Sequence, residues 1–193
     1  MEQVKARECQ NNLLNISKAV FLYVDDNQNQ LMGPVWGSQR PRAVNSKGWR
    51  YDHFSYFLQD YMPDFMEMGA DGTLYNSAFI CRANADLEMQ GIQAVHHRSH
   101  YRNTIDNIID GKPIYGRPQF KSNGNYFAAK NTLTIDVIEN TSSVEILVDS
   151  DLDNTPWLDD KPIYDFAYYP VHEEAYRNNL YFDGSVRVID WAP

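Results

Sequence analysis

One acidic segment has the spacing of a calcium-binding loop. Asp149, Asp151 and Asp153 occupy its first, third and fifth positions, where carboxylate oxygens ligate calcium, and Asp160 falls at the twelfth. Asn154 stands where such loops carry a glycine, and the glutamate expected at the end is absent. The sequence therefore leaves two interpretations open, a calcium site at Asp149, Asp151 and Asp153 or a solvated acidic loop that follows a strand.

The histidine cluster of the chain is a weaker candidate for a metal site. His96, His97 and His100 are close in sequence, and on a helix His96 and His100 would share one face. No glutamate stands in the general-base position of a zinc hydrolase motif, however, and Arg98 and Arg102 add positive charge nearby. We therefore expect these histidines to lie in a solvated polar loop.

Carboxylates near the C-terminus suggest an acidic hydrolase as one alternative function. Glu173 and Glu174 follow His172, and paired carboxylates can perform acid–base catalysis. Adjacent residues of a strand point to opposite faces, however, so this pair need not converge. The chain also lacks a Gly-x-Ser-x-Gly elbow and a phosphate-binding glycine loop. A hydrolase would have to use Glu173, Glu174 or Asp183.

The tryptophans suggest a second alternative, a secreted module that binds glycans through surface aromatics. Sugar rings stack on exposed aromatic side chains, but most aromatics in a chain of this composition fill the core. The four tryptophans are also far apart in sequence: Trp36, Trp49, Trp157 and Trp191.

Composition narrows the class of protein further. The chain has 193 residues, which fits one domain, and its 43% hydrophobic share is too high for a disordered protein. A net charge of −9 argues against general binding to nucleic acids or to anionic membrane surfaces. No apolar run reaches the roughly 18 residues that a membrane helix needs.

Hydrophobic periodicity predicts an α+β fold in which a helix comes first and strands follow. Residues 1–27 form the clearest helix, because apolar residues recur every three or four positions: Cys9, Leu13, Ile16, Val20 and Tyr23, with Leu14, Phe21 and Val24 beside them. A second helix is predicted at Asp52–Tyr61, with Asp52 as its N-cap. Helices before strands favour α+β over a doubly wound fold.

The last third of the chain is predicted to be β-rich. Its first candidate strands are Tyr126–Ala129, Leu133–Ile138 and Val144–Val148. One further strand, Ser77–Cys81, is predicted earlier in the chain. Asn179–Phe182 and Ser185–Ile189 flank Asp183-Gly184, which is a strong hairpin signal. A two-residue type I′ turn at Asp183 and Gly184 would need positive φ at both residues.

The two cysteines allow two interpretations. Cys9 and Cys81 are isolated, which argues against a cysteine-rich zinc site. They are either two buried free thiols or one disulfide. A disulfide would require an oxidising compartment.

These segments together resemble one family, the type II secretion pseudopilins, and more narrowly pilin-like proteins with a prepilin-processing-associated H-X9-DG domain. Residues 6–27 resemble the helix that follows the membrane segment, Phe79–Cys81 resembles the second cysteine, and Asn125–Asn131 and Val144–Asp149 resemble later stretches of the family. The name-giving motif is matched by His172, Asn178, Asp183 and Gly184, although ten residues separate His172 from Asp183.

The resemblance implies a non-catalytic structural subunit of a secretion pseudopilus or related envelope filament. Residues 28–124 would hold loops, short helices and a variable insertion, and 125–193 the β-rich part of one type IV pilin-like domain. The precursor would carry a membrane helix ahead of residue 1, processed by a prepilin peptidase, and the domain would face the periplasm. Its partners would be other pseudopilins and the secretion machinery. The same setting favours the Cys9–Cys81 disulfide, and some family members bind calcium in a late loop.

Overall fold

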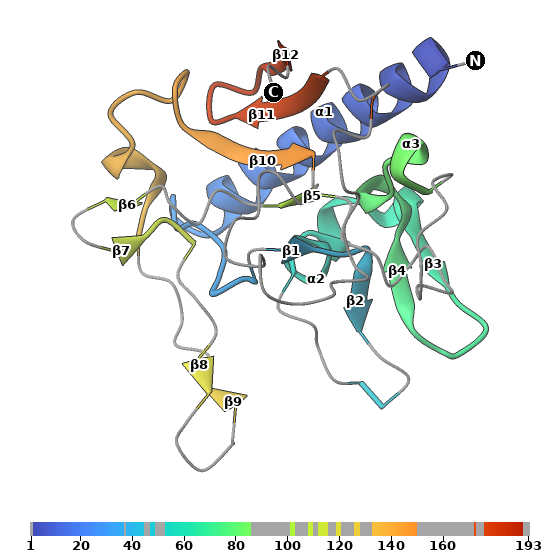
Figure 1. Ribbon diagram of the computed structural model, residues 1–193. Coiled ribbons are helices and arrows are strands. Elements are labelled where there is room, and N and C mark those ends of the chain that lie inside the picture. The colour runs from blue at the N-terminus through green and yellow to red at the C-terminus, as the bar shows by residue number, and fades with distance from the viewer. Residues whose placement is uncertain are drawn as a thin grey trace.

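The computed structural model describes residues 2–36, 38–44, 47–48, 53–85, 101–102, 108–109, 112–115, 119–120, 126–127, 133–149, 172 and 176–190. Within these residues the architecture is α+β, with a long N-terminal helix packed against antiparallel sheets (Figure 1). The predicted fold class is confirmed at this level. No helix in the described part of the chain combines the length and hydrophobicity needed to cross a bilayer.

The N-terminal helix α1 spans Glu2–Asp26 and buries the predicted stripe. Its fully buried positions, each 0% exposed, are Cys9, Leu13, Ile16 and Val20. Leu14 was expected to widen this stripe but is 39% exposed. One residue past Leu13 it is rotated by about 100° around the helix, which turns it away from the core.

The end of α1 is fixed by polar residues. The Asn27 side-chain amide donates to the carbonyl of Tyr23 at 2.8 Å. Gln28 and Asn29 then adopt left-handed backbone conformations with φ of 57° and 63°. This turn lets the Asn29 N–H donate to the carbonyl of Val24 at 2.9 Å, which satisfies a terminal helix carbonyl.

The main sheet lies against α1 and is antiparallel throughout. Its strands, in spatial order, are β1 (Ser38–Gln39), β5 (Tyr101–Arg102), β10 (Glu145–Asp149), β11 (Tyr176–Tyr181) and β12 (Val186–Asp190). Figure 1 shows α1 running beside β10–β12, with its N-terminal turns extending past these strands. Ile146, Leu147 and Leu180 from this sheet join the buried stripe of α1 in one hydrophobic cluster.

Smaller elements cover the rest of the described chain. A second antiparallel sheet has the order β2 (Arg42–Val44), β4 (Leu74–Asn76), β3 (Met66–Met68). Two short antiparallel pairs are β6 (Ile108–Ile109) with β7 (Lys112–Pro113), and β8 (Gln119–Phe120) with β9 (Tyr126–Phe127). Short helical segments are α2 (Phe54–Phe57), η1 (Gln59–Tyr61), η2 (Pro63–Phe65), η3 (Ser77–Phe79), α3 (Arg82–Ala85) and η5 (Ile135–Val137).

The helix expected at Asp52–Tyr61 is confirmed in part, because its helical residues are divided into α2 and η1 and its N-cap is His53 instead of Asp52. Two predicted strands, in contrast, are wrong. The strand expected at Ser77–Cys81 is instead the 3₁₀ turn η3, because the Asn76 side chain accepts a hydrogen bond from the Ala78 N–H at 3.1 Å and starts a helical turn.

The strand expected at Leu133–Ile138 is likewise helical. Its centre forms the 3₁₀ turn η5, and only Thr134 makes an isolated β-bridge, with Gln30. The Leu133 carbonyl accepts from the Leu31 N–H at 2.8 Å, and the Ile135 N–H donates to the Asn29 carbonyl at 2.8 Å. These bonds tie the segment to the loop after α1 instead of to a sheet.

The C-terminal hairpin lies where the sequence placed it but has a different turn. The Gly184 N–H donates to the Tyr181 carbonyl at 2.9 Å, and the Tyr181 N–H donates to the Ser185 carbonyl at 3.0 Å. Of Asp183 and Gly184 only Gly184 has a positive φ, of 80°. This is a three-residue loop, a type I turn closed by a glycine bulge, and not the predicted type I′ turn.

Gly184→Val should lower the free energy of unfolding by more than about 1 kcal/mol, because a β-branched residue is strained at positive φ. An added Cβ would meet Phe21 and Ser17 only at 3.5 Å, so the cost is backbone strain and not a clash. Gly184→Asn is the matched control and should cost less, since asparagine tolerates this conformation. Urea unfolding measures both, and equal stability of all three proteins would contradict the turn.

Candidate functional site

Three residues from the sequence predictions meet in one buried polar cluster. Asp149 ends β10, Asn178 lies on β11, and His172 forms a β-bridge with Tyr176. The side chains of Asp149, Asn178 and His172 are each 0% exposed. The Asn178 backbone N–H donates to Asp149 Oδ2 at 2.7 Å, and its side-chain Nδ2 donates to the same oxygen at 3.0 Å. The cluster therefore gives one oxygen of a carboxylate that is costly to bury alone two hydrogen-bond donors.

His172 completes this cluster through one ring nitrogen. Its Nε2 lies 3.0 Å from Asp149 Oδ2 and 2.7 Å from Asn178 Nδ2. The Tyr176 ring stacks on the imidazole, with centroids 5.1 Å apart and planes inclined by 10°. The ring is thus held by contacts on its edge and its face.

Helix α1 contributes a neutral side chain to the same cluster. Gln10 Nε2 donates to Asn178 Oδ1 at 3.0 Å, across 168 residues of sequence. Asn12 Nδ2 donates to the Ile80 carbonyl at 3.0 Å, which connects α1 to the chain just before Cys81. Polar contacts therefore join α1 both to the sheet and to the η3–α3 segment.

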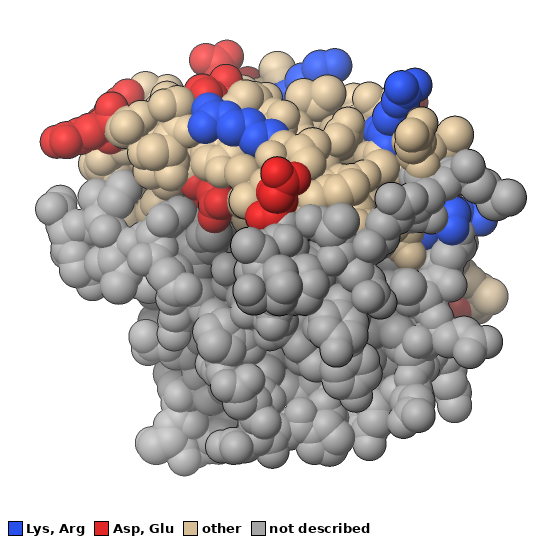
Figure 2. All heavy atoms as spheres, turned by 45° about the horizontal axis from the view of Figure 1, so that its top comes forward, with Lys and Arg blue, Asp and Glu red and all other residues tan. Residues whose placement is uncertain are grey.

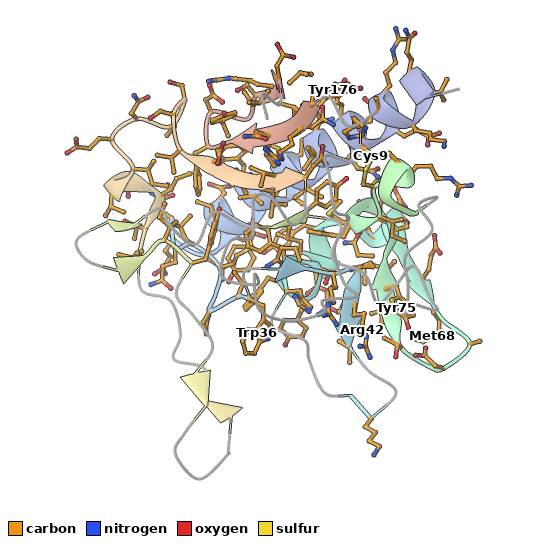
Figure 3. The ribbon with its side chains drawn as sticks, in the orientation of Figure 1. Cys9, Trp36, Arg42, Met68, Tyr75 and Tyr176 are labelled. Carbon is orange, nitrogen blue, oxygen red and sulfur yellow. A yellow bond between two sulfur atoms is a disulfide. The ribbon has the colours of Figure 1, made fainter. Side chains whose placement is uncertain are left out.

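The cysteines lie beside the polar cluster. The structure pairs Cys9 and Cys81 as a disulfide, with a Cα–Cα distance of 4.9 Å. Both are fully buried, and Cys81 Sγ lies 3.9 Å from His172 Nε2. Figure 3 places Cys9 and Tyr176 at the same end of α1. The pair joins α1 to a helical segment, since Ser77–Phe79 is not the strand that the sequence predicted.

Tyr101 of β5 lies in the same buried region. Its side chain is fully buried and packs edge-to-face near Phe79, with ring centroids 6.4 Å apart. Burial, and then the negative charge of Asp149, raise the pKa of the Tyr101 hydroxyl well above its ordinary value. The Asp149 carboxylate thus influences the Tyr101 hydroxyl through a buried, low-dielectric part of the protein.

The predicted calcium ligands are only partly placed. Asp149 directs one carboxylate oxygen to Asn178 and His172 inside the protein, so that oxygen belongs to an internal network. Asp151 and Asp153 lie outside the described residues. Calcium binding by this segment stays a prediction.

Of the other candidate residues, Asp183 and Trp36, which the structure describes, are not part of the cluster. Asp183 lies exposed in the hairpin turn, where Arg187 Nη2 pairs with its Oδ2 at 2.7 Å. Hydrogen bonds from Ser185 and the charge of Arg187 lower the pKa of Asp183, which marks it as a turn-stabilising residue. Trp36 is half-buried. Outside the described residues are His96, His97, His100, Glu173, Glu174, Trp49, Trp157 and Trp191.

Sequence reasoning missed three members of the site, Gln10, Tyr101 and Tyr176. Only tertiary contacts bring them together, and a glutamine or tyrosine carries no spacing signal of its own. The available signal was the family resemblance, which includes His172, Asn178 and the strand ending at Asp149 but does not indicate that these three residues meet.

Comparison of the chain with protein-family models, with curated proteins and with solved structures finds no match. The function is therefore inferred from the chain's own residues and geometry.

Removing the disulfide should destabilise the domain strongly. Cys9 and Cys81 are 72 residues apart, and closing a loop of that size restricts the unfolded chain by about 4 kcal/mol in the chain-entropy account. Cys9→Ala with Cys81→Ala should lower the free energy of unfolding by about this amount in urea titrations. A loss below about 1 kcal/mol would show that this bond does not hold the domain together.

The buried Asp149–His172 pair should be energetically coupled. His172→Ala should cost about 3 kcal/mol, because it leaves the carboxylate buried beside an emptied space. Asp149→Asn removes that charge, so the double variant should be more stable than the sum of the single losses predicts, by more than about 1 kcal/mol. Additivity within about 0.5 kcal/mol would contradict the coupling.

Proposed function

We propose that this chain is the globular part of a type IV pilin-like subunit, acting structurally in a type II secretion pseudopilus or a related envelope filament. The observation that carries the proposal is the two-faced helix α1. One face is buried in the domain, through Cys9, Leu13, Ile16 and Val20. The opposite face is free to contact another molecule.

The outward face of α1 carries apolar side chains that a solitary domain does not need. Val4, Leu14 and Leu22 are 60%, 39% and 54% exposed. With a rotation of about 100° per residue, all three fall on the side of the helix opposite the buried stripe. Exposed apolar residues grouped on one helical face are typical of a contact surface.

Charge on the described surface that Figure 2 shows is mixed. Figure 2 shows acidic and basic side chains interspersed among other residues on the described part of the surface. Arg7 and Lys18 are exposed on the same helix as Asp25 and Asp26. Mixed charges let copies of one subunit approach each other with opposite signs paired, which suits lateral packing of helices in a filament.

In this proposal the domain faces the periplasm and its partners are neighbouring pseudopilins and the secretion machinery. A hydrophobic helix encoded ahead of α1 would anchor the precursor in the inner membrane, and a prepilin peptidase would process it. The rigid attachment of α1 to the sheet then transmits the orientation of that helix to the whole domain.

Assembly tests this proposal. Leu14→Arg and Leu22→Arg should each reduce the amount of filament recovered by shearing about tenfold or more, because burying a charge at a helix contact costs more than 1 kcal/mol. The precursor is co-expressed with its prepilin peptidase, and the melting temperature of each purified domain should stay unchanged.

Met68→Arg is the matched control. Met68 is 68% exposed but lies on β3, far from α1 in Figure 3. This variant should assemble normally. Normal assembly of both α1 variants, or an equal defect in Met68→Arg, would overturn the proposal.

A further inference from the structure

Three side chains with metal-ligating atoms converge at the junction of α1 and the sheet. One sulfur from Cys9, one from Cys81 and a ring nitrogen of His172 all lie within 4.8 Å of one another, and all three residues are buried. Asp149 Oδ2 adds an oxygen 3.0 Å from the same histidine nitrogen, Nε2. Two sulfurs and one imidazole nitrogen are ligands that zinc accepts, and the Asp149 carboxylate beside the same nitrogen is the candidate for the fourth position.

The geometry differs from that of a catalytic cysteine. In a nucleophilic Cys–His–Asp relay, the cysteine and the carboxylate contact different nitrogens of the imidazole. Here Cys81 Sγ, at 3.9 Å, and Asp149 Oδ2, at 3.0 Å, both approach Nε2. Asn178 Nδ2 also lies 2.7 Å from this nitrogen, so zinc would have to replace that contact when it binds Nε2.

The spacing also suits tetrahedral zinc. Zinc–sulfur and zinc–nitrogen bonds of about 2.3 and 2.1 Å place neighbouring ligand atoms about 3.4–3.8 Å apart. The Cys81 Sγ to His172 Nε2 distance of 3.9 Å is close to this range. The two sulfurs, now bonded to each other, must separate, and the Asp149 carboxylate must move closer to them, because it lies outside the group of ligand atoms within 4.8 Å of one another.

We propose that reduction of the Cys9–Cys81 disulfide turns this junction into a buried structural zinc site, with Cys9, Cys81, His172 and Asp149 as ligands. A dithiol reductant gives two electrons and two protons to the S–S bond, forming two thiols and its own cyclic disulfide. Zn²⁺ then binds both sulfurs as thiolates and displaces two protons to solvent. Two thiolates neutralise the ion, and so limit the cost of burying it.

The zinc site would join the same elements as the disulfide. Cys9 lies on α1, Cys81 between η3 and α3, and Asp149 at the end of β10. The junction would thus be closed by a covalent bond under oxidising conditions and by a metal under reducing ones.

Zinc binding by the full chain tests the inference. The protein is reduced with a phosphine under inert gas and titrated with Zn²⁺ against a chromogenic chelator. We expect one Zn²⁺ per reduced chain and none for the oxidised protein. His172→Asn should weaken binding at least about tenfold, as loss of groups at metal sites does. His53→Asn, which changes another buried histidine, should leave the affinity unchanged.

A second readout covers the case in which His172→Asn does not fold after reduction. Co²⁺ added to the reduced wild-type protein should give thiolate-to-cobalt charge-transfer bands together with the visible bands of tetrahedral cobalt. A reduced protein that binds Zn²⁺ no better than the oxidised one, a His172→Asn variant that binds as tightly as wild type, or a cobalt spectrum without thiolate bands would overturn the inference.

Discussion

Burial of one carboxylate determines how this protein is put together. Asp149 is fully buried at the end of β10, and an isolated charge in such a place is costly. Asn178 and His172 supply its partners from elsewhere in the chain, and Gln10 of α1 extends the network to the helix. Apolar contacts alone would allow α1 to shift along the sheet, because they are not directional. These hydrogen bonds are directional and fix the position of α1 along the sheet. The adjacent Cys9–Cys81 pair adds a covalent bond to that arrangement.

A helix fixed in this way has one face buried against the sheet and one face exposed to solvent. The buried face joins Leu13, Ile16 and Val20 to the sheet, whereas Leu14 and Leu22 remain exposed on the opposite side. A subunit of a helical filament needs this combination, because its helix must pack with neighbours while the domain keeps a fixed orientation to it. The described contacts attach α1 to the sheet, and in the proposed filament the exposed residues are where neighbouring subunits would bind.

The long apolar stripe of the N-terminal helix and the Asp-Gly turn signal predicted their elements correctly, whereas short apolar runs did not. The stripe of α1 repeats over many turns, so it was read correctly, and Asp183-Gly184 located the hairpin. Short apolar runs such as Ser77–Cys81 fit a strand and a helical turn equally, and a local Asn76 hydrogen bond decided between them. The site was harder still, because Asp149 and Asn178 meet across 29 residues. Asp149 was grouped with its sequence neighbours, whereas its spatial partners were His172 and Asn178.

The central claim is that the junction at Cys9 and Asp149 holds α1 and the sheet as one unit. Hydrogen–deuterium exchange, compared between the oxidised protein and the reduced protein in the presence of a chelator, tests it most directly. The account predicts that the first half of α1 and strand β11 lose protection together on reduction. Loss of protection confined to the segment around Cys81, with α1 and β11 unchanged, would contradict it.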